Sequence, residues 1–160
     1  MFREIRRNKQ KLSTEATVDI LINGRFGVLG VSGDDGYPYT VPVSYVYENG
    51  KIYFHSAREG HKLDGIKQNE KVSFCVVDRD QVVPEKFANL YRSAIIFGKA
   101  KIVADDATRQ HALELIVRKY SPGYETEGAA EIAREWNKVC VVEIAIEHMA
   151  GKQAKGLVSP

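Results

Sequence analysis

The strongest constraint on the fold of this chain is a series of short β-prone segments separated by turns of hairpin length. The clearest is residues 39–48, where Val41 and Val43 point to one side and Thr40 to the other. Asn49-Gly50 follows directly, and this dipeptide is the strongest short signal for a two-residue β-hairpin. Strands joined by such turns pair antiparallel, so the sequence predicts an antiparallel sheet.

Five further strands and four helices complete the prediction. The strands are expected at residues 26–32, 51–56, 71–78, 92–104 and 139–148, and the helices at residues 14–23, after Gly60, at 105–120 and at 127–137. Residues 79–91, which contain Pro84, are expected to form a loop. This gives a mainly β protein with peripheral helices, and a six-stranded antiparallel sheet closing into a barrel, because closure removes exposed strand edges.

The length and composition fit a single domain over residues 1–160, with a basic N-terminal arm at 1–12 and a C-terminal tail at 150–160. The net charge of +2 is too small to indicate a nucleic-acid partner. No apolar run reaches the roughly 18–20 residues that a membrane span needs, and the first residues lack the apolar region of a signal peptide. Cys75 and Cys140 lie in apolar runs and are expected to be buried, reduced thiols. A cytoplasmic protein is the prediction.

The junction after the third strand concentrates positive charge where a helix begins. Arg58, His61 and Lys62 lie around Gly60, and Ser56 offers a hydroxyl donor beside them. Cations at a helix N-terminus are unfavourable, because the helix dipole is already positive there. An anion bound between them would explain the arrangement, since free amides at helix N-termini bind phosphate. The hypothesis is a phosphate site, and the alternative is a solvated basic turn without a ligand.

The second strand carries a polar face with one missing amide. Thr40, Pro42 and Ser44 lie on that face of a strand otherwise rich in valine and tyrosine. A proline inside a strand is confined to an edge or a bulge. The backbone near Pro42 is therefore available to the polar rim of a planar ligand, or the proline simply protects a sheet edge.

These residues carry a family resemblance that extends from Phe26 to Met149. The segments are VPVSYVYENGKIYFHSAREGHKLDGIKQNEKVSFCVVD and QVVPEKFANLYRSAIIFGKAKIV. They closely resemble the pyridoxamine 5'-phosphate oxidase-like FMN-binding split barrels, and among them most of all the nitroimidazole-resistance branch. The resemblance implies a split β-barrel and a homodimer with the flavin at the subunit interface.

The resemblance also implies cofactor-binding residues. The second strand, at 42–45, would line the isoalloxazine edge, residues 55–57 would follow the ribityl chain, and the helix start would hold the phosphate. Ser93, with Arg92 beside it, would come from the long strand after Tyr91. The implied cofactor-binding residues are Pro42, Val43, Ser44, Tyr45, His55, Ser56, Ala57, Arg58, His61, Lys62 and Ser93. The C-terminal arginine motif of typical pyridoxamine-phosphate oxidases is missing, since the chain ends GKQAKGLVSP, and this argues against vitamin B6 oxidation.

The function that the resemblance implies is an FMN-dependent oxidoreductase. It would be an NAD(P)H-dependent reductase of small nitroaromatic or quinone-like acceptors, in which the flavin supplies the redox chemistry and no protein nucleophile or metal is required. The alternative is a non-catalytic flavin-binding or haem-binding carrier or sensor. A haem would need an axial ligand, for which His55, His61 and His148 are the candidates.

Overall fold

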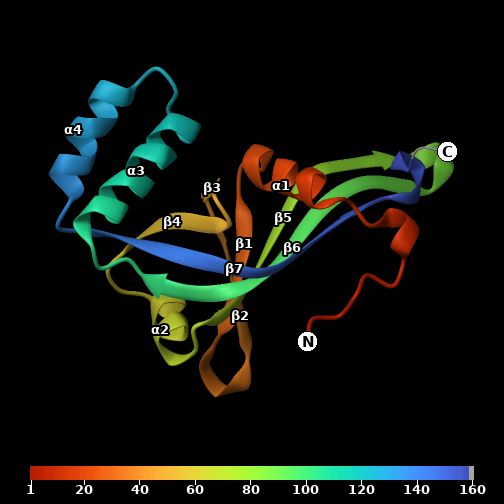
Figure 1. The fold of residues 1–160 in the computed structure, drawn as a ribbon, viewed down its shortest axis with the longest axis horizontal. Coiled ribbons are helices and arrows are strands. Elements are labelled where there is room, and N and C mark those ends of the chain that lie inside the picture. Colours follow the sequence, from red (N-terminus) through yellow and green to blue (C-terminus); the bar gives the residue numbers. More distant parts are fainter. Residues whose placement is uncertain (159–160) are drawn as a thin grey trace.

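A computed structural model describes residues 1–158 as a strongly curved antiparallel sheet with helices around it (Figure 1). The strands are β1 (Gly27–Ser32), β2 (Pro38–Val43), β3 (Val46–Glu48), β4 (Lys51–Ala57), β5 (Lys71–Val83), β6 (Ala88–Ile102) and β7 (Val139–Gln153). The α-helices are α1 (Thr14–Asn23), α2 (His61–Gln68), α3 (Asp106–Tyr120) and α4 (Glu125–Glu135). Short 3-10 turns lie at Asn8–Gln10, Asp34–Gly36, Pro84–Lys86 and Lys155–Leu157.

The sheet order explains its curvature. The strands run β2-β1-β5-β6-β7-β4-β3, so β2 and β3 lie at the two ends of the order. Only Ser44 and Tyr45 separate these two strands in the sequence. The two ends of the sheet must therefore come together, and the sheet curls into a barrel that is split, without a ladder, between β2 and β3.

Local sequence signals account for the elements that were predicted correctly. Ser13 caps α1, because its side chain accepts a hydrogen bond from the Ala16 amide. Asn49 and Gly50 both have positive φ, 48° and 78°, as the predicted two-residue turn between β3 and β4 requires. The antiparallel, mainly β fold is confirmed.

Residues 1–158 form seven strands rather than six, because the predicted strand at 39–48 breaks at Ser44–Tyr45. The predicted loop at 79–91 is wrong as well. Strands β5 and β6 continue through it as a long hairpin, which turns at Pro84–Lys86 with Phe87 in the left-handed region. Figure 1 shows this hairpin extending away from the rest of the sheet.

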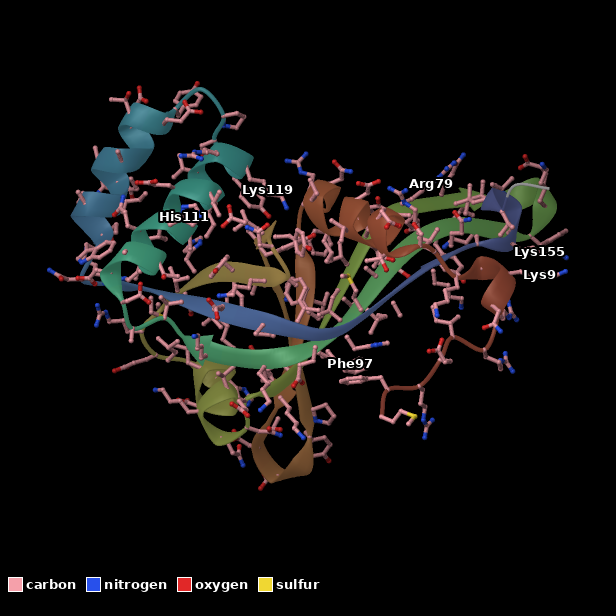
Figure 2. All side chains as sticks on the ribbon, in the orientation of Figure 1. Lys9, Arg79, Phe97, His111, Lys119 and Lys155 are labelled. Atoms are coloured by element: carbon pink, nitrogen blue, oxygen red, sulfur yellow. The ribbon has the colours of Figure 1, made fainter. Side chains whose placement is uncertain are left out.

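Both predicted terminal segments pack on the sheet in part. The arm pairs with β7 through Lys11 and Lys152, and its Phe2 ring stacks on Phe97 and His148, with centroids 5.4 and 4.7 Å apart. Figure 2 shows Phe97 on the sheet surface beside the arm. The predicted tail at 150–160 begins inside β7, which extends to Gln153. Residues 159 and 160 of the tail lie outside the described part of the chain.

Two hydrophobic clusters hold the fold together. The larger fills the barrel, with Phe54, Phe74 and Ile144 essentially fully buried. The second lies on the outer surface of β3, β4 and β7, where α3 and α4 pack as a hairpin over Tyr53 and Val141. Within residues 1–158, no helix is both long and apolar enough to cross a membrane. The α3–α4 hairpin is thus fixed over one outer face of the barrel.

Candidate functional site

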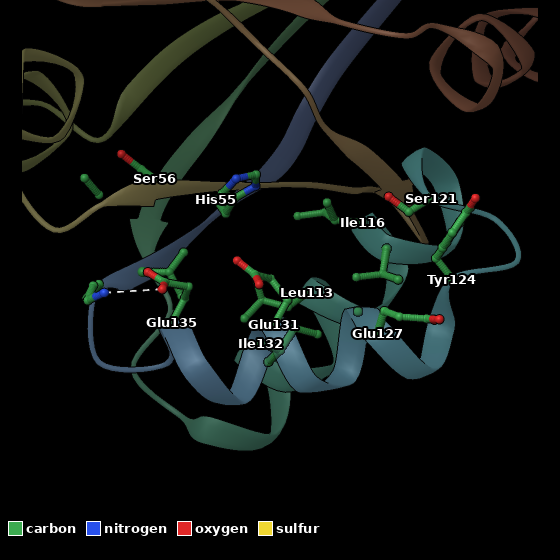
Figure 3. Close-up of a pocket in the computed structure, with 15 residues that line it drawn as sticks. His55, Ser56, Leu113, Ile116, Ser121, Tyr124, Glu127, Glu131, Ile132 and Glu135 are labelled. Carbon is green, nitrogen blue, oxygen red and sulfur yellow. Dashed lines mark hydrogen bonds and ion pairs between the residues drawn. The ribbon is translucent and has the colours of Figure 1, made fainter.

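A cavity of about 720 Å³ lies between β4 and the α3–α4 hairpin (Figure 3). This volume is within the ~300–1,000 Å³ range of small-molecule sites. Strand β4 supplies one wall through His55, Ser56 and Ala57. The helices supply the other wall, which comprises Leu113, Ile116, Val117, Ser121, Tyr124, Glu127, Gly128, Glu131, Ile132 and Glu135, and Lys138 and Val139 close one end.

The alternation of β4 places His55 in this cavity. Phe54 points into the barrel, so Tyr53 and His55 share the outer face. Tyr53 is covered by α3, whereas His55 lies farther along the strand and remains accessible. Partial burial, together with the charge of Lys62, lowers the pKa of His55 below its usual 6.5. His55 is therefore neutral at physiological pH and can donate or accept a hydrogen bond.

The cavity extends from α2 toward the split in the barrel. At one end Ala57 pairs with Val139, and the chain continues from Ala57 into α2. At the other end lies Ser121, which follows Tyr120 in the chain. Figure 3 shows Ser56 and Ser121 at opposite ends, with His55 between them and the Glu131 carboxylate directed from α4 toward β4. A long, narrow molecule could thus contact both α2 and the region of the split.

The start of α2 provides donors for an anion. Gly60 precedes the helix with φ of 136°, and the amides of His61 and Lys62 lie ahead of the first intrahelical bonds, which Leu63 and Asp64 make to the Gly60 carbonyl.

Two basic side chains and one hydroxyl in the residues next to this helix start have no ion-pair or hydrogen-bond partner, respectively, in the described part of the chain. Arg58 and Lys62 form no ion pair within residues 1–158. Ser56 is 5% exposed, and its hydroxyl has no hydrogen-bond partner among the described residues. In Figure 3 this hydroxyl points away from the α4 wall. A buried polar group without a partner is costly, so this set of donors fits a phosphate group at the head of α2.

His61 lies apart from the other basic residues of this turn. Its ring stacks on Tyr39, with centroids 4.0 Å apart, and its Nε2 lies 3.7 Å from a carboxylate oxygen of Asp34. The side chain is thus engaged with β2 and the turn before it. Of the His61 groups, the backbone amide is placed to bind an anion at the helix start, and the ring is not.

The predicted ring-binding segment is mixed in character. Pro42 and Ser44 are exposed, and β2 is an edge strand, as a proline in a strand requires. Val43 is half-buried against the barrel core. Tyr45 is fully buried, and its hydroxyl donates to the Leu21 carbonyl at 2.7 Å. Its side chain therefore belongs to the core, and only its backbone is near the split.

Ser93 and Arg92 lie on a different part of the molecule. Ser93 lines a second cavity of about 480 Å³ formed with the N-terminal arm. The Arg92 guanidinium is bonded to the Asp78 carboxylate, with Nε–Oδ1 at 2.9 Å. Within one chain, the structure does not bring these residues to the cavity beside β4.

The sequence prediction missed the helical wall of the cavity. Leu113, Ile116 and Val117 were recognisable as the apolar stripe of α3, but such a stripe indicates burial and not a ligand. Tyr124, Glu127 and Glu131 carried no signal that links them to His55. Their position depends on how the α3–α4 hairpin packs on β4. Close approach of α4 to α3 is possible because a Cβ at Gly128 would lie 2.4 Å from a Val117 methyl group.

Comparison with known proteins gives one family. The sequence pattern of the family described as pyridoxamine 5'-phosphate oxidase matches residues 13–153. A search of curated proteins found no match.

Solved structures with the same fold include three bacterial proteins. A Bacteroides thetaiotaomicron protein, provisionally assigned as a 5-nitroimidazole antibiotic resistance protein, is 24% identical, with a TM-score of 0.73 over 89% of this chain and 86% of its own. The conserved hypothetical protein Rv2991 of Mycobacterium tuberculosis is 21% identical, with a TM-score of 0.82 over 98% and 94%. The FAD and heme binding protein of Mycobacterium smegmatis is 22% identical, with a TM-score of 0.76 over 95% and 76%. At these identities the similarity establishes the fold.

Proposed function

The chain belongs to the pyridoxamine 5'-phosphate oxidase family, and we propose that it binds FMN between β4, the start of α2 and the α3–α4 hairpin. With this cofactor, the protein acts as an NAD(P)H-dependent reductase of small nitroaromatic or quinone-like acceptors. The observation that carries this proposal is the position of the donors at α2. Arg58, Lys62 and the unpartnered Ser56 hydroxyl lie where β4 leaves the cavity wall and enters the helix.

Each part of the site has a role that follows from its chemistry. The amides at the start of α2, with Lys62 and Arg58, bind the phosphate by charge-assisted hydrogen bonds. His55, neutral at physiological pH, offers a hydrogen bond to the hydroxylated chain. The backbone at 42–45 contacts the polar edge of the ring. Bound flavin supplies hydride and electron transfer, while the protein supplies position and electrostatics.

The apolar wall of the cavity restricts the kind of electron acceptor that can bind there beside the cofactor. Leu113, Ile116 and Ile132 are nearly buried yet line the wall, which favours a flat, weakly polar molecule. Glu127 and Glu131 on α4 disfavour anions there. This supports a small neutral acceptor, and the Bacteroides neighbour, by its assignment to 5-nitroimidazole resistance, supports a nitroaromatic one.

A homodimer is part of the proposal. Ser93 and Arg92 lie on β6, away from the β4 cavity, so they can join a flavin site only as residues of a second copy. The same part of β6 exposes Ile95 and Phe97, each by about 40%. Exposed apolar surface of this kind is a common property of interfaces. Sedimentation equilibrium gives the mass in solution, and a monomer at every concentration would exclude the shared site.

A haem-binding carrier is the second candidate, because His55 combines a lowered pKa with a place on the cavity wall. A neutral imidazole is the form that binds iron. The visible spectrum of the purified protein separates the candidates. Flavin bands that bleach when NADH or NADPH is added without oxygen support the reductase. Flavin bands indifferent to both nucleotides support a carrier, and a Soret band supports haem.

Lys62→Ala tests the phosphate site directly. Loss of one charge-assisted hydrogen bond should weaken FMN binding about 10- to 100-fold. Riboflavin lacks the phosphate, so its affinity should not change. Lys67→Ala, on the exposed last turn of the same helix, is the matched control. Titration by flavin fluorescence gives all the affinities, and equal FMN affinity in the Lys62 variant and the wild type would place the phosphate elsewhere.

A further inference from the structure

The hydroxyl of Tyr120 lies at the split between β2 and β3. Tyr120 is the last residue of α3, and its hydroxyl accepts a hydrogen bond from the Tyr45 amide at 2.8 Å. Its single proton can be donated to the Tyr45 carbonyl at 2.8 Å or to the Arg25 carbonyl at 2.7 Å. The hydroxyl therefore binds the Tyr45 amide, and with its own proton it binds the carbonyl of either Tyr45 or Arg25, at the point where the strand ladder is interrupted.

These bonds replace strand pairing that Tyr45 lacks. The β1–β2 ladder ends at the pair Gly27–Val43, and the β3–β4 ladder begins at Val46–Tyr53. Between them, the backbone of Ser44 and Tyr45 has no partner strand among residues 1–158. A buried peptide group needs a hydrogen bond. Without the Tyr120 hydroxyl, the Ser44–Tyr45 segment would have to move for the backbone groups of Tyr45 to find other hydrogen-bond partners. The hydroxyl thus fixes the conformation of the segment 42–45.

The same residue connects this segment to the cavity. Ser121, the residue after Tyr120, lines the cavity, and so do Ile116 and Val117 in the preceding turn. Burial raises the pKa of Tyr120, so the hydroxyl keeps its proton at neutral pH and remains a donor. Helix α3 is therefore both a wall of the cavity and the support of the backbone expected to bind the ring edge.

We propose that Tyr120 is a positioning residue for the flavin site: its hydroxyl holds the backbone of Ser44 and Tyr45 in the conformation that receives the ring of the cofactor. This inference rests on the proposed function. Tyr120 does not contact the phosphate end, because α2 lies at the opposite end of the cavity. Its contribution is therefore to the ring end of the ligand alone.

Tyr120→Phe keeps the aromatic ring in the hydrophobic cluster that it joins and removes only the hydrogen bond that the hydroxyl accepts and the one that it donates. The Tyr45 amide should then exchange with solvent faster in the unliganded protein, measured by hydrogen exchange. Affinity should fall about tenfold, the size expected for loss of a hydrogen bond that holds a binding segment. The fall should be equal for FMN and riboflavin, since both carry the ring.

The matched control is Tyr47→Phe on β3, whose hydroxyl has no hydrogen bond among the described residues. It should leave both affinities unchanged. Together with Lys62→Ala, which should affect FMN alone, the variants separate the two ends of the ligand. A purely structural role for Tyr120 would lower stability without changing the affinity of the folded protein.

Two results would overturn the inference while leaving the proposed function in place. One is a Tyr120→Phe protein that binds FMN and riboflavin as the wild type does. The other is a loss confined to FMN, which would place the effect at the phosphate. Failure of the wild-type protein to bind FMN at all would instead refute the proposed function.

Discussion

Replacing Lys119 by methionine should stabilise the protein at neutral pH. The Lys119 amine is buried without a hydrogen-bond partner in the described structure. It lies 4.1 Å from the ring centroid of Tyr45 and 5.5 Å from that of Tyr120. Figure 2 shows it at the end of α3 that faces α1. Burial lowers its pKa from 10.5 to about 8, so the folded state disfavours the charged amine.

The size of the effect follows from linkage. A pKa lowered from 10.5 to about 8 corresponds to about 3 kcal/mol of folding free energy lost below pH 8. Methionine removes this cost and keeps the unbranched stem, but it gives up a cation–π contact of about 1–2 kcal/mol. The net expectation is a gain of about 1–2 kcal/mol at pH 7.

The pH dependence distinguishes this cause from simple repacking. Between pH 8 and 10.5 the unfolded chain binds a proton at Lys119 that the folded chain does not, so wild-type stability rises with pH. The methionine variant lacks this rise. From pH 7 to pH 9.5, the free energy of unfolding of the wild type should therefore increase by about 2 kcal/mol relative to that of the methionine variant.

Urea unfolding at pH 7, 8 and 9.5, followed by the fluorescence of the single tryptophan, Trp136, measures these free energies. Other groups that titrate in this range are common to both proteins and cancel in the difference. Lys71→Met, at an exposed position, is the control and should change stability by less than about 0.5 kcal/mol. A Lys119→Met protein less stable than wild type at pH 7, or a difference independent of pH, would refute the reasoning.

Two further predictions concern α2 and its neighbour on β4. By NMR titration, His55 should show a pKa below 6.5, and Lys62→Ala should raise it part of the way back, because burial is the larger cause and the Lys62 charge the smaller. Since the folded state favours neutral His55, its contribution to stability should increase as pH rises through the range just below 6.5. An ordinary His55 pKa would contradict its placement in the cavity wall. Gly65→Ala should destabilise the protein by about 1–3 kcal/mol, because the added Cβ would lie 2.5 Å from the Ser32 carbonyl oxygen and 2.6 Å from a Val31 methyl group. Urea unfolding checks this, and unchanged stability would mean that α2 packs less closely on β1.

Elements with a local chemical signal were predictable from the sequence. Ser13 before α1 and Asn49-Gly50 between β3 and β4 act through their own backbone, so the expected structure appears where they stand. Leu63 and Ile66 are three residues apart, a spacing typical of one helix face, and both are buried in α2.

The wrong secondary-structure predictions lie where the local sequence pattern gave no signal or indicated a different structure. The hairpin at 79–91 has mostly exposed or half-buried side chains on both faces, so burial imposes no alternation there, and Pro84 indicated a loop. The alternation of residues 39–48 continues through Ser44–Tyr45, which concealed the break. That break is set by curvature of the whole sheet and by Tyr120, 75 residues away.

The candidate site was predictable along β4 and α2 but not across from them. His55, Ser56 and Ala57 line the cavity, and Lys62 lies close enough to affect the pKa of His55. The opposite wall depends on the docking of α3 and α4, a tertiary contact without a sequence motif. Ser93 was proposed as a cofactor-binding residue from the family resemblance alone. Within one chain it lies away from the cavity beside β4 and lines the cavity formed with the N-terminal arm.

The place of β7 in the sheet order bears on how the chain acquires its structure during synthesis. Strand β7 lies between β6 and β4 and is hydrogen-bonded to both, although it is the last strand of the described chain. Until it emerges from the ribosome, β4 and β6 each present an unpaired edge, and no ladder of hydrogen bonds joins the two halves of the sheet, which are connected only through the chain. A ribosome that stalls within the α3–α4 hairpin would therefore hold a nascent chain with two open edges in addition to those of β2 and β3. Such an intermediate is of the kind that chaperones bind and that aggregates without them.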